Sequence, residues 1–214
     1  MRSLFRRKLI QHSPLEGYDL WAKSYSNEKN PIKSFSDAFV NNSKPSLNGK
    51  KVLDVGCGPG IFCAQAEIEG ASEIVGIDLS PEMILVAKSK CQRVRFIEGS
   101  ILNAQPGNGF DVLVCSLVLG HLENLTRALD KLIEALGNGG ILILTDFHPY
   151  QTLTNARRTF KDDKNNTHEV IHYLHHISEY FSGLKESASI ETFEEFFYNE
   201  MPVVFGMTAR KKGD

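Results

Sequence analysis

Residues 52–62, VLDVGCGPGIF, constrain the fold more than any other stretch of the chain. Three glycines and a proline fall within positions 56–60, directly after a run of apolar strand-forming residues, and a helix-like pattern follows. Glycine beside a strand usually marks a place where a side chain would collide with something close to the backbone. The stretch therefore predicts a strand that turns sharply into a helix, with backbone N–H groups free to face a ligand.

From residue 50 onward, strand-like segments alternate with helix-like segments. The second predicted helix opens with Ser80 as N-cap and Pro81 at its first position, which is a typical helix start. The fourth strand is apolar almost throughout, as a strand covered on both faces should be. The alternation predicts an α/β fold with a mostly parallel sheet and right-handed crossovers. The predicted strands are 50–56, 73–80, 94–100, 110–122 and 141–149, and the predicted helices are 61–71, 80–91 and 124–140.

The regions that flank this core are less regular. Residues 1–45 are predicted to be partly helical, so we divide the chain into an N-terminal helical lid segment, 1–45, and a main domain, 46–214. Residues 151–170 are polar without a sustained period and predict a loop or small insertion, and we expect a cap insertion over about 150–185, after the fifth strand. A strand within 168–176, a helix over 177–188 and a strand over 201–212 complete the prediction.

The composition gives no reason to expect a nucleic-acid partner. The chain of 214 residues carries 24 Lys and Arg against 26 Asp and Glu, a formal net charge of −2, whereas nucleic-acid-binding domains usually present a basic face. The four cysteines have no Cys-x-x-Cys spacing, which favours reduced thiols over a disulfide framework. No apolar run approaches the roughly 20 residues of a membrane span, and the start MRSLFRRKLI lacks the apolar core of a secretion signal. We expect a cytoplasmic protein without a membrane partner.

The glycine turn and the acid at the end of the next strand suggest a nucleotide-like ligand. Ligands of open parallel sheets bind beyond the carboxyl ends of the strands, where Asp78 is placed to accept hydrogen bonds from ribose hydroxyls. The dinucleotide fingerprint G-x-G-x-x-G/A requires a small residue where this chain has Ile61, and no Lys-Ser/Thr pair follows for a phosphate-binding loop. A nicotinamide-dependent oxidoreductase is therefore a disfavoured alternative.

Five segments in order, VLDVGCGPG, GIDLSPEMI, VRFIEGSIL, FDVLVCSLVLGHL and LGNGGILIL, resemble the successive motifs of class I S-adenosylmethionine-dependent methyltransferases. The resemblance covers roughly residues 15–150 and implies a Rossmann-like, doubly wound sheet of about seven strands, with S-adenosyl-L-methionine as cofactor. It implies that Asp78 holds the ribose, that the glycines let the backbone approach the cofactor, and that Ser100 replaces the usual acid near the adenine. The implied cofactor-binding residues are Asp54, Gly56, Cys57, Gly58, Gly60, Asp78, Leu79, Ser100, Ile101, Cys115, Ser116 and Leu117.

Upstream, YDLWAKSY at 18–25 resembles the N-terminal element of small-molecule methyltransferases, in which aromatic residues fold over the cofactor as a lid. Tyr18 and Tyr25 are the matching positions and join the expected cofactor-binding residues. Alternatively, Trp21 and Tyr25 are four residues apart and suit an amphipathic helix anchored in the core. The two interpretations are compatible.

Methyl transfer from a sulfonium is an in-line displacement, so the protein mainly has to align the acceptor, exclude water and sometimes remove a proton. His121 and His148 lie at the ends of the fourth and fifth predicted strands, and we expect them to contact the acceptor or to act as a base. The competing interpretation is that each is a loop histidine bonded to the backbone.

The cap supplies the candidates for substrate binding, and a solvated loop is their competing interpretation. The two arginines could bind an acceptor carboxylate or phosphate. His172 and His176 are four residues apart, but no cysteine or adjacent acid completes a recognisable ligand set, so we predict no metal site. The candidates are Tyr150, Arg157, Arg158 and His172.

These observations predict S-adenosylmethionine-dependent methyl transfer to a small-molecule acceptor, carried out by a monomer or homodimer. The Asn/Asp-Pro-Pro-aromatic set of enzymes that methylate nucleobase amines is missing after the fourth strand, where this chain reads CSLVLGHL. RNA and protein acceptors stay open as alternatives. So does a catalytically silent protein that binds the cofactor and serves as a regulatory or partner subunit.

Overall fold

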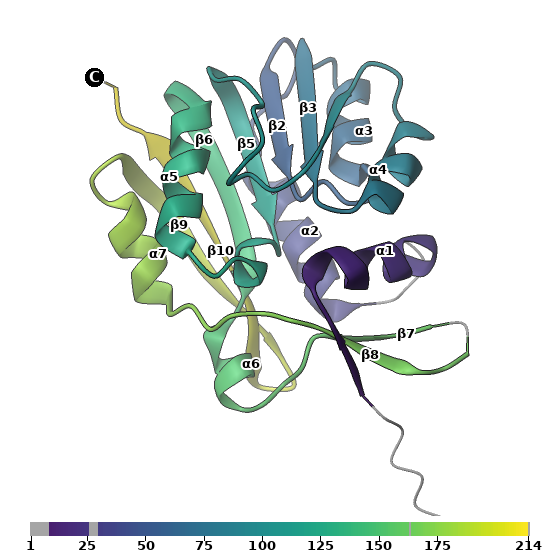
Figure 1. The fold of residues 1–214 in the computed structure, drawn as a ribbon. Helices are drawn as coiled ribbons and strands as arrows, with labels where there is room; N and C mark the ends of the chain where they lie inside the picture. The colour runs from purple at the N-terminus through teal and green to yellow at the C-terminus, as the bar shows by residue number, and fades with distance from the viewer. Residues whose placement is uncertain (1–8, 26–29, 163, 214) are drawn as a thin grey trace, which may run out of the picture.

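The computed structural model describes residues 9–25, 30–162 and 164–213, and its main layer is a seven-stranded sheet (Figure 1). The strand order is β4-β3-β2-β5-β6-β10-β9. The first five strands in this order run parallel, whereas β10 is antiparallel to both β6 and β9. The predicted Rossmann-like, mostly parallel sheet is confirmed. Its strands are β2 (Lys51–Val55), β3 (Glu73–Asp78), β4 (Arg95–Glu98), β5 (Phe110–Ser116), β6 (Leu136–Phe147), β9 (Ala188–Tyr198) and β10 (Met201–Lys211).

Helices cover both faces of this sheet because its central strands bury side chains on both faces. In β5, Leu113 and Cys115 pack in one hydrophobic cluster with α5 and α7, whereas Val112 and Val114 pack in the other with α2 and α3. The alternation follows from the two-residue period of a strand. Among the described residues, no helix is long and apolar enough to cross a membrane. The helices are α1 (Pro14–Tyr25), α2 (Pro31–Ser43), α3 (Ile61–Ile68), α4 (Pro81–Lys88), α5 (Leu125–Ala135), α6 (Pro149–Leu153) and α7 (Ile177–Leu184), with a 3₁₀ turn at Leu119–His121.

A second, three-stranded sheet joins the N-terminal segment to the predicted cap insertion. In it, β1 (Ile10–His12) pairs parallel with β8 (Thr167–Val170), and β8 pairs antiparallel with β7 (Thr159–Lys161). The sequence analysis predicted neither β1 nor β7, because strands of three residues show no visible period. Residues 1–8 and 26–29 of the predicted lid segment lie outside the described residues.

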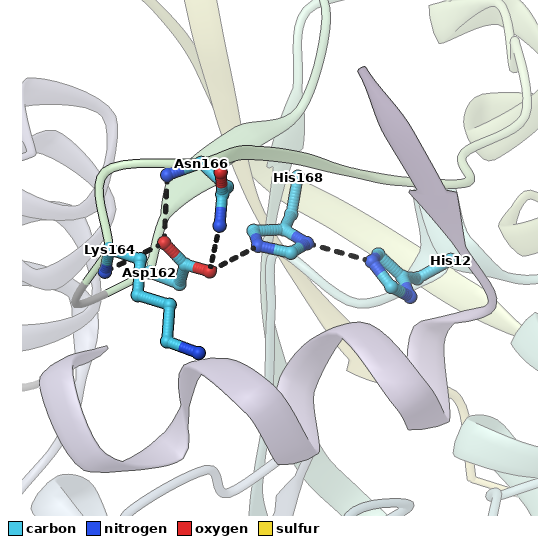
Figure 2. A network of polar contacts seen from close by, with 5 residues as sticks. All are labelled: His12, Asp162, Lys164, Asn166 and His168. Atoms are coloured by element: carbon cyan, nitrogen blue, oxygen red, sulfur yellow. Dashed lines mark hydrogen bonds and ion pairs between the residues drawn. The ribbon is translucent and has the colours of Figure 1, made fainter. Parts of the chain in front are cut away.

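A chain of polar contacts holds this second sheet together (Figure 2). His12 Nε2 and His168 Nδ1 share a hydrogen bond of 2.9 Å, and His168 Nε2 lies 3.1 Å from Asp162 Oδ2. Asp162 also accepts the backbone N–H groups of Lys164 at 2.9 Å and Asn166 at 2.7 Å. The Asn166 side-chain amide donates to Asp162 Oδ2 at 2.8 Å, and this hydrogen bond, followed by the others, lowers the pKa of the Asp162 carboxyl to about 2. The network thus fixes the turn between β7 and β8 and ties both strands to β1.

Stacked rings connect the second sheet to α1. The Phe160 ring of β7 stacks on His168 with centroids 5.1 Å apart and on Trp21 of α1 with centroids 4.7 Å apart. Gly17 of α1 packs against Val170 of β8, and a Cβ on Gly17 would stand 2.7 Å from a Val170 methyl carbon. α1 and the second sheet therefore form one packed unit.

The hairpin at the end of the chain differs from the prediction. The predicted helix over 177–188 ends at Leu184, and the unpredicted strand β9 begins at Ala188. β9 lies at the sheet edge with mostly exposed side chains, and its apolar residues Ile190, Phe193 and Phe196 are three apart, so the sequence lacks the two-residue period of a strand. Asn199 and Glu200 have φ values of 48° and 65° and connect β9 to β10, as expected for a two-residue hairpin turn with positive φ at both positions. The predicted strand within 168–176 is confined to the end of β8.

The glycine turn after β2 contains three positive φ angles, +71° at Gly56, +50° at Gly58 and +74° at Gly60. The three glycines have different surroundings. A Cβ on Gly56 would collide with the Val118 side chain, and one on Gly60 would stand 2.8 Å from the Ala87 Cβ of α4. A Cβ on Gly58 would meet no atom within 4 Å. The sequence analysis gave all three the same role, but Gly56 and Gly60 avoid side chains of the protein itself, and only Gly58 of the three opens onto free space.

These surroundings predict different costs for two alanine substitutions. Gly60→Ala combines a left-handed alanine with overpacking against α4, and we expect it to lower the free energy of unfolding by about 2–4 kcal/mol. Gly58→Ala adds only the backbone strain, about 1–2 kcal/mol. Urea denaturation of both variants measures the difference. Equal losses would contradict the assignment of Gly60 to helix packing.

Candidate active site

A groove runs along the carboxyl ends of β2, β3 and β5, and α1 supplies part of its wall. Ten of the fourteen predicted cofactor-binding residues meet there, together with His121. Asp54 and Cys57 line an adjoining cavity that shares Gly56, Gly58 and Leu117 with the groove. The predicted residues that line the groove itself are Tyr18, Tyr25, Gly56, Gly58, Asp78, Leu79, Ser100, Ile101, Ser116, Leu117 and His121.

Asp78 ends β3 at the centre of the groove. Its carboxylate accepts the backbone N–H of Gly58 at 2.7 Å and that of Ser80 at 2.9 Å, one on each oxygen. Burial raises the pKa of this carboxyl, and the two N–H donors work against that rise. Ser80 Oγ caps α4 by accepting the Met83 N–H at 3.1 Å and donates its own hydrogen to Asp19 of α1. One carboxylate thus connects the glycine turn to α4, and through Ser80 to α1.

Asp54 is buried at the end of β2. Its Oδ2 accepts the thiol hydrogen of Cys63 over 3.4 Å. Burial raises the pKa of the Asp54 carboxyl to about 7, and the nearby Asp78 charge adds to the rise. The group therefore changes protonation close to neutral pH.

Tyr18 and His121 form a pair at the other side of the groove. The His121 Nδ1 lies 2.8 Å from the carbonyl oxygen of Ile171. Because a carbonyl only accepts, Nδ1 carries the hydrogen, and Nε2 accepts the Tyr18 hydroxyl at 2.9 Å. Burial lowers the pKa of His121 to about 4 and raises that of Tyr18 well above its ordinary value. Both groups are neutral near pH 7.

The turn after β5 carries backbone strain. Leu117 has a φ of 59°, which is costly for a branched residue and typical of functional sites. Its N–H donates to the Thr145 carbonyl at 2.8 Å. The neighbouring Ser116 hydroxyl lies 2.7 Å from that of Ser36 and 3.1 Å from that of Thr145. Three hydroxyls from β5, β6 and α2 thus fix the turn that lines the groove.

His148 lies elsewhere. Its Nδ1 accepts the Tyr150 N–H at 3.2 Å and its Nε2 donates to Glu195 at 2.8 Å, so the ring caps α6 and ties it to β9. Neither His148 nor Tyr150 lines the groove or the adjoining cavity. The structure does not bring His148 and His121 together, because β6 extends beyond its pairing with β5 before His148 is reached.

Three other predicted residues pack or pair within the protein and do not line the groove. Cys115 is fully buried in the sheet core, on the face that packs against α5. Gly60 packs against α4. Arg157 is exposed and forms an ion pair of 3.2 Å with Glu169. The neighbouring turn residues Ser116 and Leu117, not Cys115, reach the groove.

The remaining cap candidates are half-buried. His172 Nε2 lies 3.2 Å from Thr152 Oγ1, and burial lowers the pKa of its ring. Arg158 places its guanidinium over the ring of Phe147 at the end of β6, and burial lowers its pKa to about 9. In the described part of the chain, no three His, Cys, Asp or Glu side chains gather so as to hold a metal ion.

Two site features escaped the sequence analysis. Ser36 is fully buried on α2 and bonded to the β5 turn, but a single serine in a helix gives no sequence signal of such a role. Asp146 is fully buried and accepts the Gly120 N–H and the Tyr180 hydroxyl, each at 2.8 Å. An acid inside an otherwise apolar strand was the signal that could have revealed it.

The raised pKa of Asp54 predicts a pH-dependent stability. The native protein keeps this proton up to about pH 7, whereas the unfolded chain releases it near the ordinary 3.8. The contribution of Asp54 to the free energy of unfolding is therefore fully present below about pH 4 and is lost as pH rises to about 7, by about 4 kcal/mol at most.

Urea denaturation of the wild type and Asp54→Asn at about pH 5 and about pH 8 tests this. We expect the wild type to lose more stability than the variant between the two values. His121, whose effect has the opposite sign, is common to both proteins and cancels. If the wild type and Asp54→Asn lost the same free energy of unfolding between the two pH values, the raised pKa of Asp54 would be contradicted.

Comparisons with known proteins agree with this geometry. An uncharacterized protein of Haemophilus influenzae is 31% identical over 145 residues, 63% of this chain and 56% of that relative. The mitochondrial ubiquinone biosynthesis O-methyltransferase of Schizosaccharomyces pombe is 37% identical over 106 residues, 46% of this chain and 38% of that relative. This chain therefore spans no more than 56% of the length of either relative.

Solved structures share the fold. An S-adenosylmethionine-dependent methyltransferase from Mesorhizobium loti gives a TM-score of 0.68 at 21% identity, over 80% of this chain and 95% of that one. DhpI in complex with SAH gives a TM-score of 0.72 at 18% identity, over 94% of this chain and 97% of that one. The family described as "Methyltransferase domain" matches residues 46–197, and the chain belongs to this family.

Proposed function

We propose that this protein transfers a methyl group from S-adenosyl-L-methionine to a small-molecule acceptor. The observation that carries the proposal is the groove in which the Asp78 carboxylate and the Gly58 amide meet at the carboxyl ends of β3 and β2. Nucleotide-like ligands bind at this edge of open α/β sheets. The names of similar proteins support it, since they include a demethylmenaquinone methyltransferase and a DhpI complex with SAM.

The residues of the groove fit the adenosyl part of this cofactor. Each Asp78 oxygen accepts one backbone N–H, so lone pairs are left for the two ribose hydroxyls. Leu79, 37% exposed, and the side chain of Ile101 offer apolar surface to the adenine. The free space beside Gly58 lets the backbone approach the ligand. Asp54, in the adjoining cavity, would bind the ammonium group, directly or through water.

When bound, the cofactor supplies a methyl group activated by a cationic sulfur. The chain has to hold the acceptor in line with that methyl and exclude water. We assign Tyr18 and His121 to contact with the acceptor. A histidine with a pKa of about 4 is a weak base near neutral pH, so its role is to fix the Tyr18 hydroxyl rather than to take a proton completely.

The surroundings of the groove favour a small acceptor. α1 lines the groove with Tyr18 and Tyr25, and the second sheet packs against the neighbouring α1 residues, Phe160 on Trp21 and Val170 on Gly17. Such a cover suits a molecule that the site can enclose. A protein acceptor is the second candidate, because the ribosomal protein L11 methyltransferase of Aliivibrio fischeri is 36% identical over 95 residues.

Calorimetric titration with S-adenosylmethionine, S-adenosylhomocysteine and NADH tests the cofactor. We expect micromolar binding of the two adenosyl compounds alone. Asp78→Asn keeps the shape of the side chain but removes its charge, and it should weaken S-adenosylhomocysteine binding by at least about tenfold, the scale of a charge-assisted hydrogen bond. Glu98→Gln is the matched control, because Glu98 pairs with Asp78 in register on β4 but is exposed and lies outside the groove.

Equal binding by the wild type and a folded Asp78→Asn variant would remove Asp78 from the cofactor site. Transfer of a labelled methyl group to a panel of small molecules then tests the reaction. Tight cofactor binding without turnover of any acceptor would favour the silent cofactor-binding protein. Label appearing only in protein or RNA of a cell extract would overturn the small-molecule acceptor.

A further inference from the structure

We propose that Arg158 binds an anionic oxygen group of the methyl acceptor, so that the acceptor is a small carboxylate or phosphoryl compound. The inference rests on the proposed methyl transfer and adds the chemical class of its acceptor. It follows from the surroundings of Arg158. Its Nε is buried and unpaired, whereas the neighbouring Arg157 is exposed and forms an ion pair with Glu169.

The guanidinium of Arg158 has unused hydrogen-bond donors. Its Nε is buried and has no hydrogen-bond partner, and the side chain forms no ion pair with any residue in the described ranges. A guanidinium carries five N–H donors in a fixed planar fork. Buried donors in folded proteins are nearly always bonded, so an orphaned one calls for a specific explanation.

The nearby acids are already engaged. Glu169 pairs with Arg157 at 3.2 Å. Asp146 is the acid whose charge acts most strongly on Arg158, but its Oδ2 accepts two hydrogen bonds and its Oδ1 accepts the Phe147 N–H at 2.8 Å. Asp146 therefore moderates the charge of Arg158 from a distance without bonding its N–H groups.

Arg158 lies beside the groove, near Tyr18 and His121, although it is not itself a lining residue. Its guanidinium covers the Phe147 ring, and Phe147 lines a small cavity together with Tyr18, Trp21 and Leu117. Its charge acts on His121 and contributes to the lowering of that pKa. The arginine is thus close to the Tyr18–His121 pair that the proposed function sets against the acceptor.

The second sheet holds Arg158 in place. Its carbonyl accepts the Val170 N–H at 2.8 Å, and Phe160, two residues further along, stacks between Trp21 and His168. The network in Figure 2 fixes the same sheet. A guanidinium held in this way needs little further ordering when it binds a planar or tetrahedral oxyanion.

The charge balance favours an anion over a neutral acceptor. Burial lowers the pKa of Arg158 only to about 9, so the group is cationic near neutral pH. A partly desolvated cation without a bonded counter-ion is costly. Lys33, whose Nζ lies 4.8 Å from the centroid of the Tyr25 ring, lines the small cavity that Phe147 lines, but its charge is partly offset by Asp37 in the adjoining cavity.

The test uses the full-length protein saturated with S-adenosylhomocysteine, titrated calorimetrically with four probes. Inorganic phosphate and methylphosphonate represent the phosphoryl class, and acetate and propionate the carboxylate class. We expect saturable binding of at least one class by the wild type and by Arg157→Gln, weakened at least about tenfold in Arg158→Gln. Arg157→Gln is the matched control, since it removes the adjacent exposed arginine.

Arg158→Lys keeps the charge but not the planar fork, and intermediate binding is expected. If Arg158→Gln does not fold, the comparison of anion binding is made between the wild type and Arg158→Lys. In the wild type, the ¹⁵N-detected Nε–H signal that disappears in Arg158→Lys should shift on addition of the bound probe.

Each outcome decides the proposal. No saturable binding of any probe by the wild type, or equal binding by folded Arg158→Gln, would overturn the role of Arg158. If Arg157→Gln weakened anion binding as much as Arg158→Gln does, the anion site could not be assigned to Arg158 alone. Because S-adenosylhomocysteine binding is measured first in every variant, a failure of the cofactor assignment is seen separately from a failure of anion binding.

Discussion

The Asp78 carboxylate links the parts of the structure that form the groove. Its two oxygens hold the Gly58 amide and the Ser80 amide, so it determines both the shape of the glycine turn and the start of α4. The Ser80 hydroxyl then donates to Asp19, which brings α1 to the same point. The burial that raises the pKa of this carboxyl also strengthens its attraction for any donor that replaces water. A ribose bound there would meet a site that is already ordered.

The parallel sheet was predictable because its signals are local. Each strand of β2 to β6 is an apolar run followed by a turn or a helix start, as Ser80 and Pro81 show. The second sheet was not predictable, because β1 and β8 are paired across most of the chain and each is only three or four residues long. What specifies that pairing is a histidine on each strand and an aspartate in a turn, and no pattern in the sequence connects them.

The site residues divide in the same way. Gly58 and Asp78 were predictable from their positions at strand ends, since the carboxyl ends of parallel strands converge. The direction in which each side chain points was not predictable from the sequence. Arg157 and Arg158 are adjacent and alike in sequence, yet one is exposed with Glu169 and the other covers Phe147. Their difference arises because successive residues of an extended segment point to opposite faces, and which face is inside depends on the pairing of β7 with β8.

The two ends of the site carry opposite charge, and this arrangement suits a reaction between a cation and an anion. Asp78 lies where the proposed cofactor is bound, and Arg158 lies near Tyr18 and His121. A cationic donor and an anionic acceptor would each be held by the end of opposite sign, which orients both before any bond changes. His121, kept neutral by burial, lies between the two ends and adds no charge that would repel the sulfonium. The lowered pKa of this histidine therefore has a use beyond proton transfer.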